Sequence, residues 1–72
     1  MSIETEFAVC CLEEYKFVHK MTGAAVIELF KKYNVVDYLI RHYEALHTTS
    51  LAYCVEDVDQ YLSNRKRVSD NP

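Results

Sequence analysis

The sequence predicts an all-α protein, a small compact bundle of about four short helices. Apolar residues recur at steps of three and four along most of the chain, which is the spacing of one helix face. The chain has one Gly, and its one Pro is the last residue. The pairs Asn-Gly and Asp-Gly, which form the tight turns of hairpins, do not occur.

The first helix is expected over residues 3–19. Ser2 can cap its start, and Glu4 and Glu6 lie near the positive end of the helix dipole. Its apolar stripe should face the core. The stripe consists of Phe7, Cys11, Tyr15 and Val18, widened by Val9, Cys10 and Phe17.

A second helix is expected over residues 22–33, because the segment "KMTG" interrupts the apolar pattern and Thr22 is a suitable cap. Asn34 suits the left-handed conformation that often ends a helix, and Lys31 and Lys32 complement the negative end of the dipole. The expected buried side consists of Val26, Ile27, Phe30 and Tyr33.

Two further helices are expected over residues 36–47 and 51–65, with Val35 as a short linker before the third. The third stripe contains Val36, Leu39, Ile40, Tyr43 and Leu46 or His47, and the fourth contains Leu51, Val55, Val58 and Leu62. The ending "NRKRVSDNP" has no apolar periodicity. We therefore expect a single helical domain over residues 1–64 and a mobile C-terminal tail over residues 65–72.

The length of 72 residues allows one domain with one small core. Such a core leaves only about 3 to 5 kcal/mol of stability, and pairing with a second copy is a common remedy. No apolar run is long enough to cross a membrane, and "MSIETEF" lacks the basic start and apolar stretch of a signal peptide. We expect a cytoplasmic protein that forms a homodimer.

The stretch "HYEALHTTSLAY", residues 42–53, concentrates polar and reactive side chains. His47 as a base with Thr48 or Thr49 as a nucleophile would need a geometry that adjacent residues rarely provide. We expect a structural joint instead, in which Tyr43 and His47 continue the buried stripe and Thr48 and Ser50 link the helix ends. Ser50 is the default cap of the fourth helix.

Catalytic, metal and cofactor sites are not expected. A metal would require side chains such as Cys11, Cys54 and His47 to converge, and no paired ligand spacing predicts this. Cys10 and Cys11 on a core stripe lack the exposure that a redox sensor needs. No catalytic pair of carboxylates, glycine-rich loop or triad can be assembled from the residues present, so we do not expect an enzyme.

A small helix-turn-helix-like regulator that binds nucleic acid is the alternative function. The third helix would enter the major groove. Its outward residues include Asp37, Arg41, His42 and Glu44, a mixed face. The net charge of −3 disfavours this alternative, whereas the basic run "RKR" at residues 65–67 favours it. Nucleic acid is therefore an unlikely partner.

The sequence also resembles a bacterial family of short proteins known as a domain of unknown function, number three-seven-nine-one. The resemblance rests on "TEFAVCCLEEY", on "TGAAVIELFKKYNVVDYLIRHYEALHTTS" with Tyr43, Leu46, His47 and Thr48, and on "AYCVEDVDQYL". It implies a small helical protein with no assigned activity. It also implies genes encoded near ADP-ribosyltransferase-like proteins, and hence a partner or antitoxin-like role.

The most favoured function is a non-enzymatic protein interaction module that binds another protein or a second copy of itself. Tyrosine and arginine are typical of the residues that dominate binding energy at interfaces. The expected contact residues are Tyr38, Arg41, Tyr53 and Tyr61. An equally good reading is that the tyrosines cover the core with their hydroxyls in water.

Overall fold

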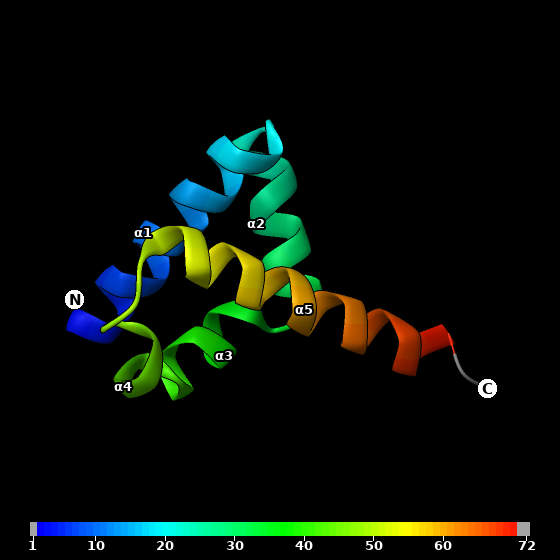
Figure 1. The fold of residues 1–72 in the computed structure, drawn as a ribbon. Helices are drawn as coiled ribbons and strands as arrows, with labels where there is room; N and C mark the ends of the chain where they lie inside the picture. The colour runs from blue at the N-terminus through cyan, green and yellow to red at the C-terminus, as the bar shows by residue number, and fades with distance from the viewer. Residues whose placement is uncertain (1, 71–72) are drawn as a thin grey trace.

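The computed structural model describes residues 2–70, with side chains as far as Arg67. Every regular element in this range is a helix, which confirms the predicted fold class, with five helices in place of about four. They are α1 (Ile3–His19), α2 (Gly23–Lys32), α3 (Val35–Arg41), α4 (Tyr43–Leu46) and α5 (Leu51–Asp70). α1 and α2 meet at one corner, and α5 crosses them before extending away from the other helices (Figure 1).

α1 spans the predicted residues because both of its ends are closed by local hydrogen bonds. The backbone N–H of Thr5 donates to Oγ of Ser2 at 3.1 Å. At the other end Lys20 has a φ of 53°, and the N–H of Met21 donates to the carbonyl of Lys16 at 3.0 Å. This left-handed ending usually falls on Gly or Asn, so a lysine there gave no signal in the sequence.

α2 begins at its expected cap, where the N–H of Ala25 donates to Oγ1 of Thr22 at 3.1 Å. After α2, Asn34 adopts a φ of 56°, which confirms the left-handed residue that the sequence predicted. Val35 is not a linker, however. It is the first residue of α3 and is fully buried, so the two-residue turn falls at Tyr33 and Asn34, one position earlier than expected.

The single helix predicted over residues 36–47 is divided into α3 and α4 by a bend at His42. His42 has φ −104° and ψ 18°, outside the usual helical range. Helical hydrogen bonding resumes at once, because the N–H of Leu46 donates to the carbonyl of His42 at 2.9 Å. No Gly or Pro marks this bend, so the apolar periodicity continues across it and sequence reasoning missed it.

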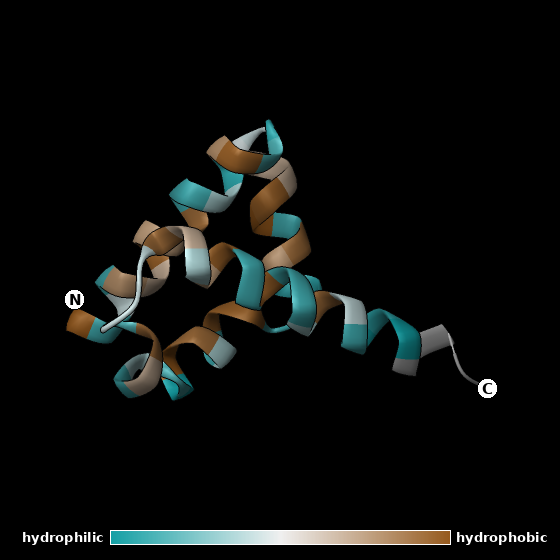
Figure 2. Cartoon of the chain, in the orientation of Figure 1, coloured by the Kyte–Doolittle hydropathy of each residue, from teal (hydrophilic) through white to brown (hydrophobic). Residues whose placement is uncertain are grey.

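α5 extends further than the predicted end at residue 65. Arg and Lys favour helices, and the segment contains no Gly or Pro before Pro72. The backbone is helical to Asp70, so residues 65–70 of the expected tail belong to α5, and residues 71–72 lie outside the described residues. The end of α5 is mostly hydrophilic, whereas α3 is largely apolar (Figure 2). The mobility of residues 65–72 stays a prediction.

The core lies where α1, α2, α3 and α5 meet. Its buried residues are Ala8, Cys11, Tyr15, Val26, Phe30, Val35, Leu39, Leu46, Cys54, Val55, Val58 and Leu62. The apolar stripes expected from the sequence include more residues than the structure buries. Expected core positions that are in fact exposed are Val9, Cys10, Phe17, Val18, Ile27, Val36, Ile40, His47 and Leu51. A chain this short cannot cover both sides of each helix, so each buries only a narrow stripe.

Candidate functional site

The joint between α4 and α5 is held by hydrogen bonds to the backbone. Nδ1 of His47 donates to the carbonyl of Tyr43 at 2.8 Å. The hydroxyl of Thr48 donates to the carbonyl of Ala45 at 3.2 Å, and that of Thr49 donates to the carbonyl of Leu46 at 2.7 Å.

Ser50 caps α5, since the N–H of Tyr53 donates to its Oγ at 3.1 Å. The four N–H groups at the start of a helix have no partner within it, and this bond satisfies one of them. The hydroxyls of Thr48, Thr49 and Ser50 therefore all take part in local backbone bonding.

His47 does not lie on a buried stripe, which corrects the expectation from the sequence. It is exposed, and its ring stacks on the half-buried ring of Tyr43 with centroids 4.4 Å apart. The physical reason is the bend at His42, after which Leu46 alone continues the core. Among the described residues, no hydroxyl is bonded to His47 as a nucleophile would be to its base.

Cys11 and Cys54 are buried next to each other, whereas Cys10 is exposed. Burial, with Cys54 beside it, raises the pKa of Cys11 from 9.0 to about 12. The thiol of Cys54 lies 3.7 Å from the carbonyl of Leu46. The Cys11 thiol is thus held in the unreactive protonated form. Within the described part of the chain, no three Cys, His, Asp or Glu side chains group closely enough to hold a metal ion.

Two of the four expected contact residues use their hydroxyl groups in hydrogen bonds within the fold. The hydroxyl of Tyr38 donates to the carboxylate of Asp57, and the hydroxyl of Tyr61 donates to the carbonyl of Tyr33 at 2.7 Å. The rings of Tyr38 and Tyr61 stack with centroids 4.1 Å apart. Both side chains are half-buried, so much of each ring covers the core.

The other two expected contact residues are at the surface. Tyr53 is 51% exposed. Arg41 is also exposed and forms an ion pair with Asp37 one turn earlier, with 3.3 Å between nitrogen and oxygen. The structure does not gather Tyr38, Arg41, Tyr53 and Tyr61 into one exposed surface, because two of them point into contacts between α3 and α5.

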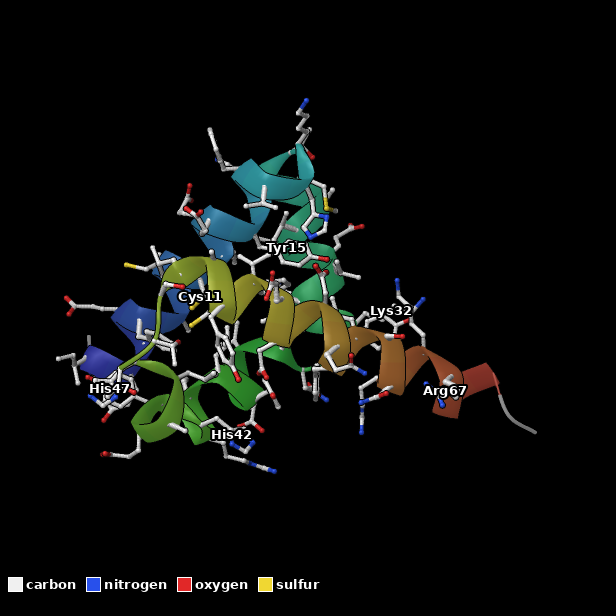
Figure 3. The ribbon with its side chains drawn as sticks, viewed as in Figure 1. Cys11, Tyr15, Lys32, His42, His47 and Arg67 are labelled. Carbon is white, nitrogen blue, oxygen red and sulfur yellow. The ribbon has the colours of Figure 1, made fainter. Side chains whose placement is uncertain are left out.

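A polar contact that the sequence did not reveal connects α1 with α5. Nε2 of His19 lies 3.0 Å from a carboxylate oxygen of Asp59. Burial and the nearby Asp59 raise the pKa of Tyr15 from 10.0 to about 12. Asp57 and Asp59 flank the buried Val58, and no local pattern in the sequence indicates that Asp59 meets His19. Figure 3 shows Tyr15 inside the bundle beside α5.

An exposed, shallow apolar groove runs along the outer side of α1 and the start of α5. It has a volume of about 910 Å³. Its apolar lining consists of Val9, Cys10, Phe17, Val18, Met21 and Leu51. Phe17 is the most exposed of these, at 79%. We call this surface the α1 groove. Sequence reasoning placed most of its residues in the core and so did not identify it.

Acidic and basic residues both border the α1 groove, in a fixed order along α1. Glu13 and Glu14 line it just past the middle of α1, and Lys16 and Lys20 line it in the following turns, at the C-terminal end of α1. Lys16 and Glu13 form an exposed ion pair with 3.3 Å between nitrogen and oxygen. The groove therefore combines an apolar floor with a rim in which two acids are followed, within one to two turns, by two bases.

The chain matches the family model described as Protein of unknown function (DUF3791) over residues 6–65. The chain belongs to this family. The DUF3791 match begins within the first turns of α1 and ends in α5, so it includes the joint and the whole apolar lining of the α1 groove. No curated protein and no solved structure matches the sequence significantly.

Membership of the DUF3791 family agrees with the resemblance noted in the sequence, and it assigns no activity. The match stops at Arg65, so the last residues of α5 lie outside the part of the chain that the family model describes. Within the described residues, no helix combines the length and hydropathy needed to cross a bilayer.

Proposed function

We propose that this DUF3791 protein is a non-enzymatic protein interaction module, and that the α1 groove pairs with the α1 groove of a second copy. The observation that carries the proposal is the exposure of Phe17, a large apolar side chain on an apolar groove. Aromatic side chains with an apolar surround and a polar rim are typical of the centre of a protein interface.

The geometry of α1 favours an antiparallel pair. α1 has 17 residues, so it is about 25 Å long. In an antiparallel pair, Glu13 and Glu14 of one copy lie near Lys16 and Lys20 of the other. In a parallel pair, like charges would meet. The same patch then serves on both copies, which is the condition for a two-fold symmetric dimer.

Pairing would also offset the small size of the core. A domain of this length has little stability to spare, and burying the α1 groove would remove apolar surface from water at about 25 cal/mol per Å². An exposed apolar patch is otherwise a liability for aggregation. Self-association would therefore cover the apolar side chains of the α1 groove that a single chain leaves exposed.

Sedimentation velocity over a wide range of protein concentration tests the proposal. The wild-type protein should sediment as a dimer that dissociates on dilution, and Phe17→Asp should be a monomer. Ile27→Asp is the matched control, because Ile27 is an exposed aliphatic residue of α2 outside the groove. A wild-type protein that is monomeric at every concentration would refute the pairing.

Charge exchange tests the antiparallel arrangement. A variant with Glu13→Lys and Glu14→Lys has a wholly basic rim, and a variant with Lys16→Glu and Lys20→Glu has a wholly acidic rim. Each variant alone should be a monomer because its like charges repel. Mixed together, they should form a heterodimer. Two variants that stay monomeric when mixed would contradict the arrangement, provided that circular dichroism shows both to be folded.

A more specific form of the proposal is an antitoxin-like or accessory role toward an effector encoded nearby, of the ADP-ribosyltransferase-like kind that the family resemblance implied. The mechanism would be occlusion of the effector by a helix face. Co-purification from native cells tests this role. Recovery of the effector in equal amounts with the wild-type protein and with Phe17→Asp would refute this role.

The alternative of a helix-turn-helix regulator receives little support from α3. This helix has only seven residues, and Arg41 on its outer side is paired with Asp37. An acid beside the arginine would repel phosphate. We therefore retain the interaction module as the proposed function.

A further inference from the structure

Basic side chains gather at the end of the molecule where α2 ends and α5 leaves the bundle. They are Lys31, Lys32, Arg65, Lys66 and Arg67, which we call the basic end. Nζ of Lys32 lies 5.5 Å from the ring centroid of Tyr33, and Nζ of Lys66 lies 6.0 Å from the same centroid. The fold thus brings together two basic runs that are far apart in the sequence. Figure 3 shows Lys32 and Arg67 on this side of the molecule.

The local charge is opposite to that of the protein as a whole. The basic end holds five of the eight Lys and Arg residues, and the whole chain carries a formal charge of −3. Everything outside the basic end therefore carries −8. No acid occurs in the sequence between Asp59 and Asp70. Glu28 lies beside Lys31 and Lys32 on α2, so the excess of positive charge is greatest along α5. It produces a local field that attracts anions, which the net charge conceals.

The cations surround α5 rather than follow one side of it. Successive residues of an α-helix are rotated by about 100°, so Arg65, Lys66 and Arg67 point in three directions. A flat acidic surface would meet only one of these directions. A groove with anions on both walls would meet all three. The end of α5 projects beyond the other helices and is free to enter such a groove (Figure 1).

Two of the cations are held in place before any ligand binds. Cζ of Arg65 lies 5.9 Å from the ring centroid of Tyr61, and Lys66 lies over Tyr33. Tyr61 is itself fixed by its hydrogen bond to the carbonyl of Tyr33. Contacts with aromatic rings restrict long side chains, so less conformational entropy is lost when they bind a phosphate.

We propose that the basic end binds double-stranded DNA, with the projecting end of α5 in the major groove. A helix with its side chains is about 10 to 12 Å in diameter, and the major groove of B-form DNA is about 12 Å wide. Arg65, Lys66 and Arg67 contact phosphates on the two groove walls. Lys31 and Lys32, at the base of the projecting helix, contact the backbone at the groove edge. The surface is separate from the α1 groove, so it does not depend on pairing through that groove.

Fluorescence anisotropy with a labelled DNA duplex of mixed sequence tests this proposal. Binding should weaken steeply with salt, with a log–log slope of about −3 to −5 for three to five phosphate contacts. The triple variant Arg65→Gln, Lys66→Gln, Arg67→Gln should bind at least about tenfold more weakly, with a slope smaller in magnitude by about 3. A variant with Lys31→Gln and Lys32→Gln should lose about 2 from the slope.

Single substitutions provide the matched control. Arg67→Gln and Arg41→Gln each remove one exposed arginine, from α5 and α3 respectively. The first should weaken binding and the second should leave it within about twofold, since only phosphate contacts contribute to the salt dependence. Circular dichroism establishes that each variant is folded. Equal losses for the two arginines would overturn the proposal.

Competition identifies the class of ligand. Unlabelled DNA duplex should displace the labelled duplex, and polyglutamate of equal charge should do so far less. Duplex RNA should also compete weakly, because its major groove is too narrow and deep for a helix. Equal competition by polyglutamate or by duplex RNA would overturn entry into a DNA groove, as would failure of the wild-type protein to bind DNA at low salt.

Discussion

Nε2 of His19, the last residue of α1, lies 3.0 Å from the carboxylate of Asp59 on α5. The two residues are 40 positions apart, and both are only partly exposed. This contact joins the end of the first helix to the middle of the last. It lies beside Tyr15, whose ring packs against His19 with centroids 4.2 Å apart.

Asp59→Asn should lower the free energy of unfolding by about 1 kcal/mol, because it removes the charge that faces His19 at a partly buried site. Urea denaturation followed by circular dichroism gives this value. Asp37→Asn is the control, since Asp37 and Arg41 form an exposed pair within one helix that should contribute less than about 0.5 kcal/mol. If the two variants were equally stable, the contact with His19 would have no structural role.

The protein should lose stability in alkaline solution. The pKa of Tyr15 rises from 10.0 to about 12 through burial and Asp59, and the pKa of Cys11 rises from 9.0 to about 12 through burial and Cys54. Burial and the hydrogen bond to Asp57 also raise the pKa of Tyr38 above its ordinary range. The folded state therefore binds these protons more tightly than the unfolded state.

For a raised pKa, the contribution to stability is complete below the unfolded value and is lost as pH rises through the folded value. The free energy of unfolding should thus be constant up to about pH 9 and should fall between about pH 9 and 12. Tyr15→Phe should reduce this slope, because it removes one of the groups whose pKa is raised. A slope that Tyr15→Phe leaves intact would contradict the assignment.

Thiol reagents should distinguish the three cysteines. Cys10 is exposed, whereas Cys11 and Cys54 are buried. Cys10 lines the α1 groove, so the assay uses the Phe17→Asp variant, in which the groove should not pair. An Ellman assay on this folded variant should show one fast thiol, and the same variant with Cys10→Ser should show none. All three thiols should react in denaturant. Fast reaction of a second thiol in the native protein would mean that the region between α1 and α5 opens readily.

The sequence predicted the helical class well because apolar periodicity and caps are local signals. Ser2, Thr22 and Asn34 all act at helix ends as their residue types suggested. It did not predict which apolar residues are buried, because that depends on how far each helix is rotated against its neighbours. Val35 and Val36 illustrate this: the sequence placed the second in the core, and the structure buries the first.

The pair Val35 and Val36 offers a direct test of that rotation. Val35 is 0% exposed and Val36 is 38% exposed, and both begin the same helix. Val35→Ala should cost about 2 kcal/mol, since it removes buried apolar surface and leaves a cavity. Val36→Ala should cost less than about 0.5 kcal/mol, because the higher helix propensity of Ala offsets the small loss of burial. Chemical denaturation of both variants gives the two losses in the free energy of unfolding. A larger loss for Val36→Ala than for Val35→Ala would show that Val36, and not Val35, lies in the core.

The α1 groove and the basic end could not be derived from the sequence for a related reason. The α1 groove exists because Phe17, Val9 and Leu51 are excluded from a core that is too small for them. The basic end exists because α5 passes the end of α2, which no local pattern encodes. The joint is different, since Ser50 and the threonines bond to backbone groups within five residues.

The cap at Ser50 should therefore behave as a local feature with a measurable effect on the whole fold. Ser50→Ala removes the acceptor for the N–H of Tyr53 and should lower the free energy of unfolding by about 1 kcal/mol. Ser50→Asp should restore most of this loss, because a carboxylate also accepts the bond and interacts favourably with the positive end of the helix dipole. Thr48→Ala is the control, since the Thr48 hydroxyl donates to a carbonyl that other donors can satisfy. A domain of this size has a free energy of unfolding of about 3 to 5 kcal/mol, so a loss of about 1 kcal/mol is readily seen in thermal unfolding. A Ser50→Ala variant as stable as wild type would show that the start of α5 is fixed by packing of Cys54 and Val55 rather than by its cap.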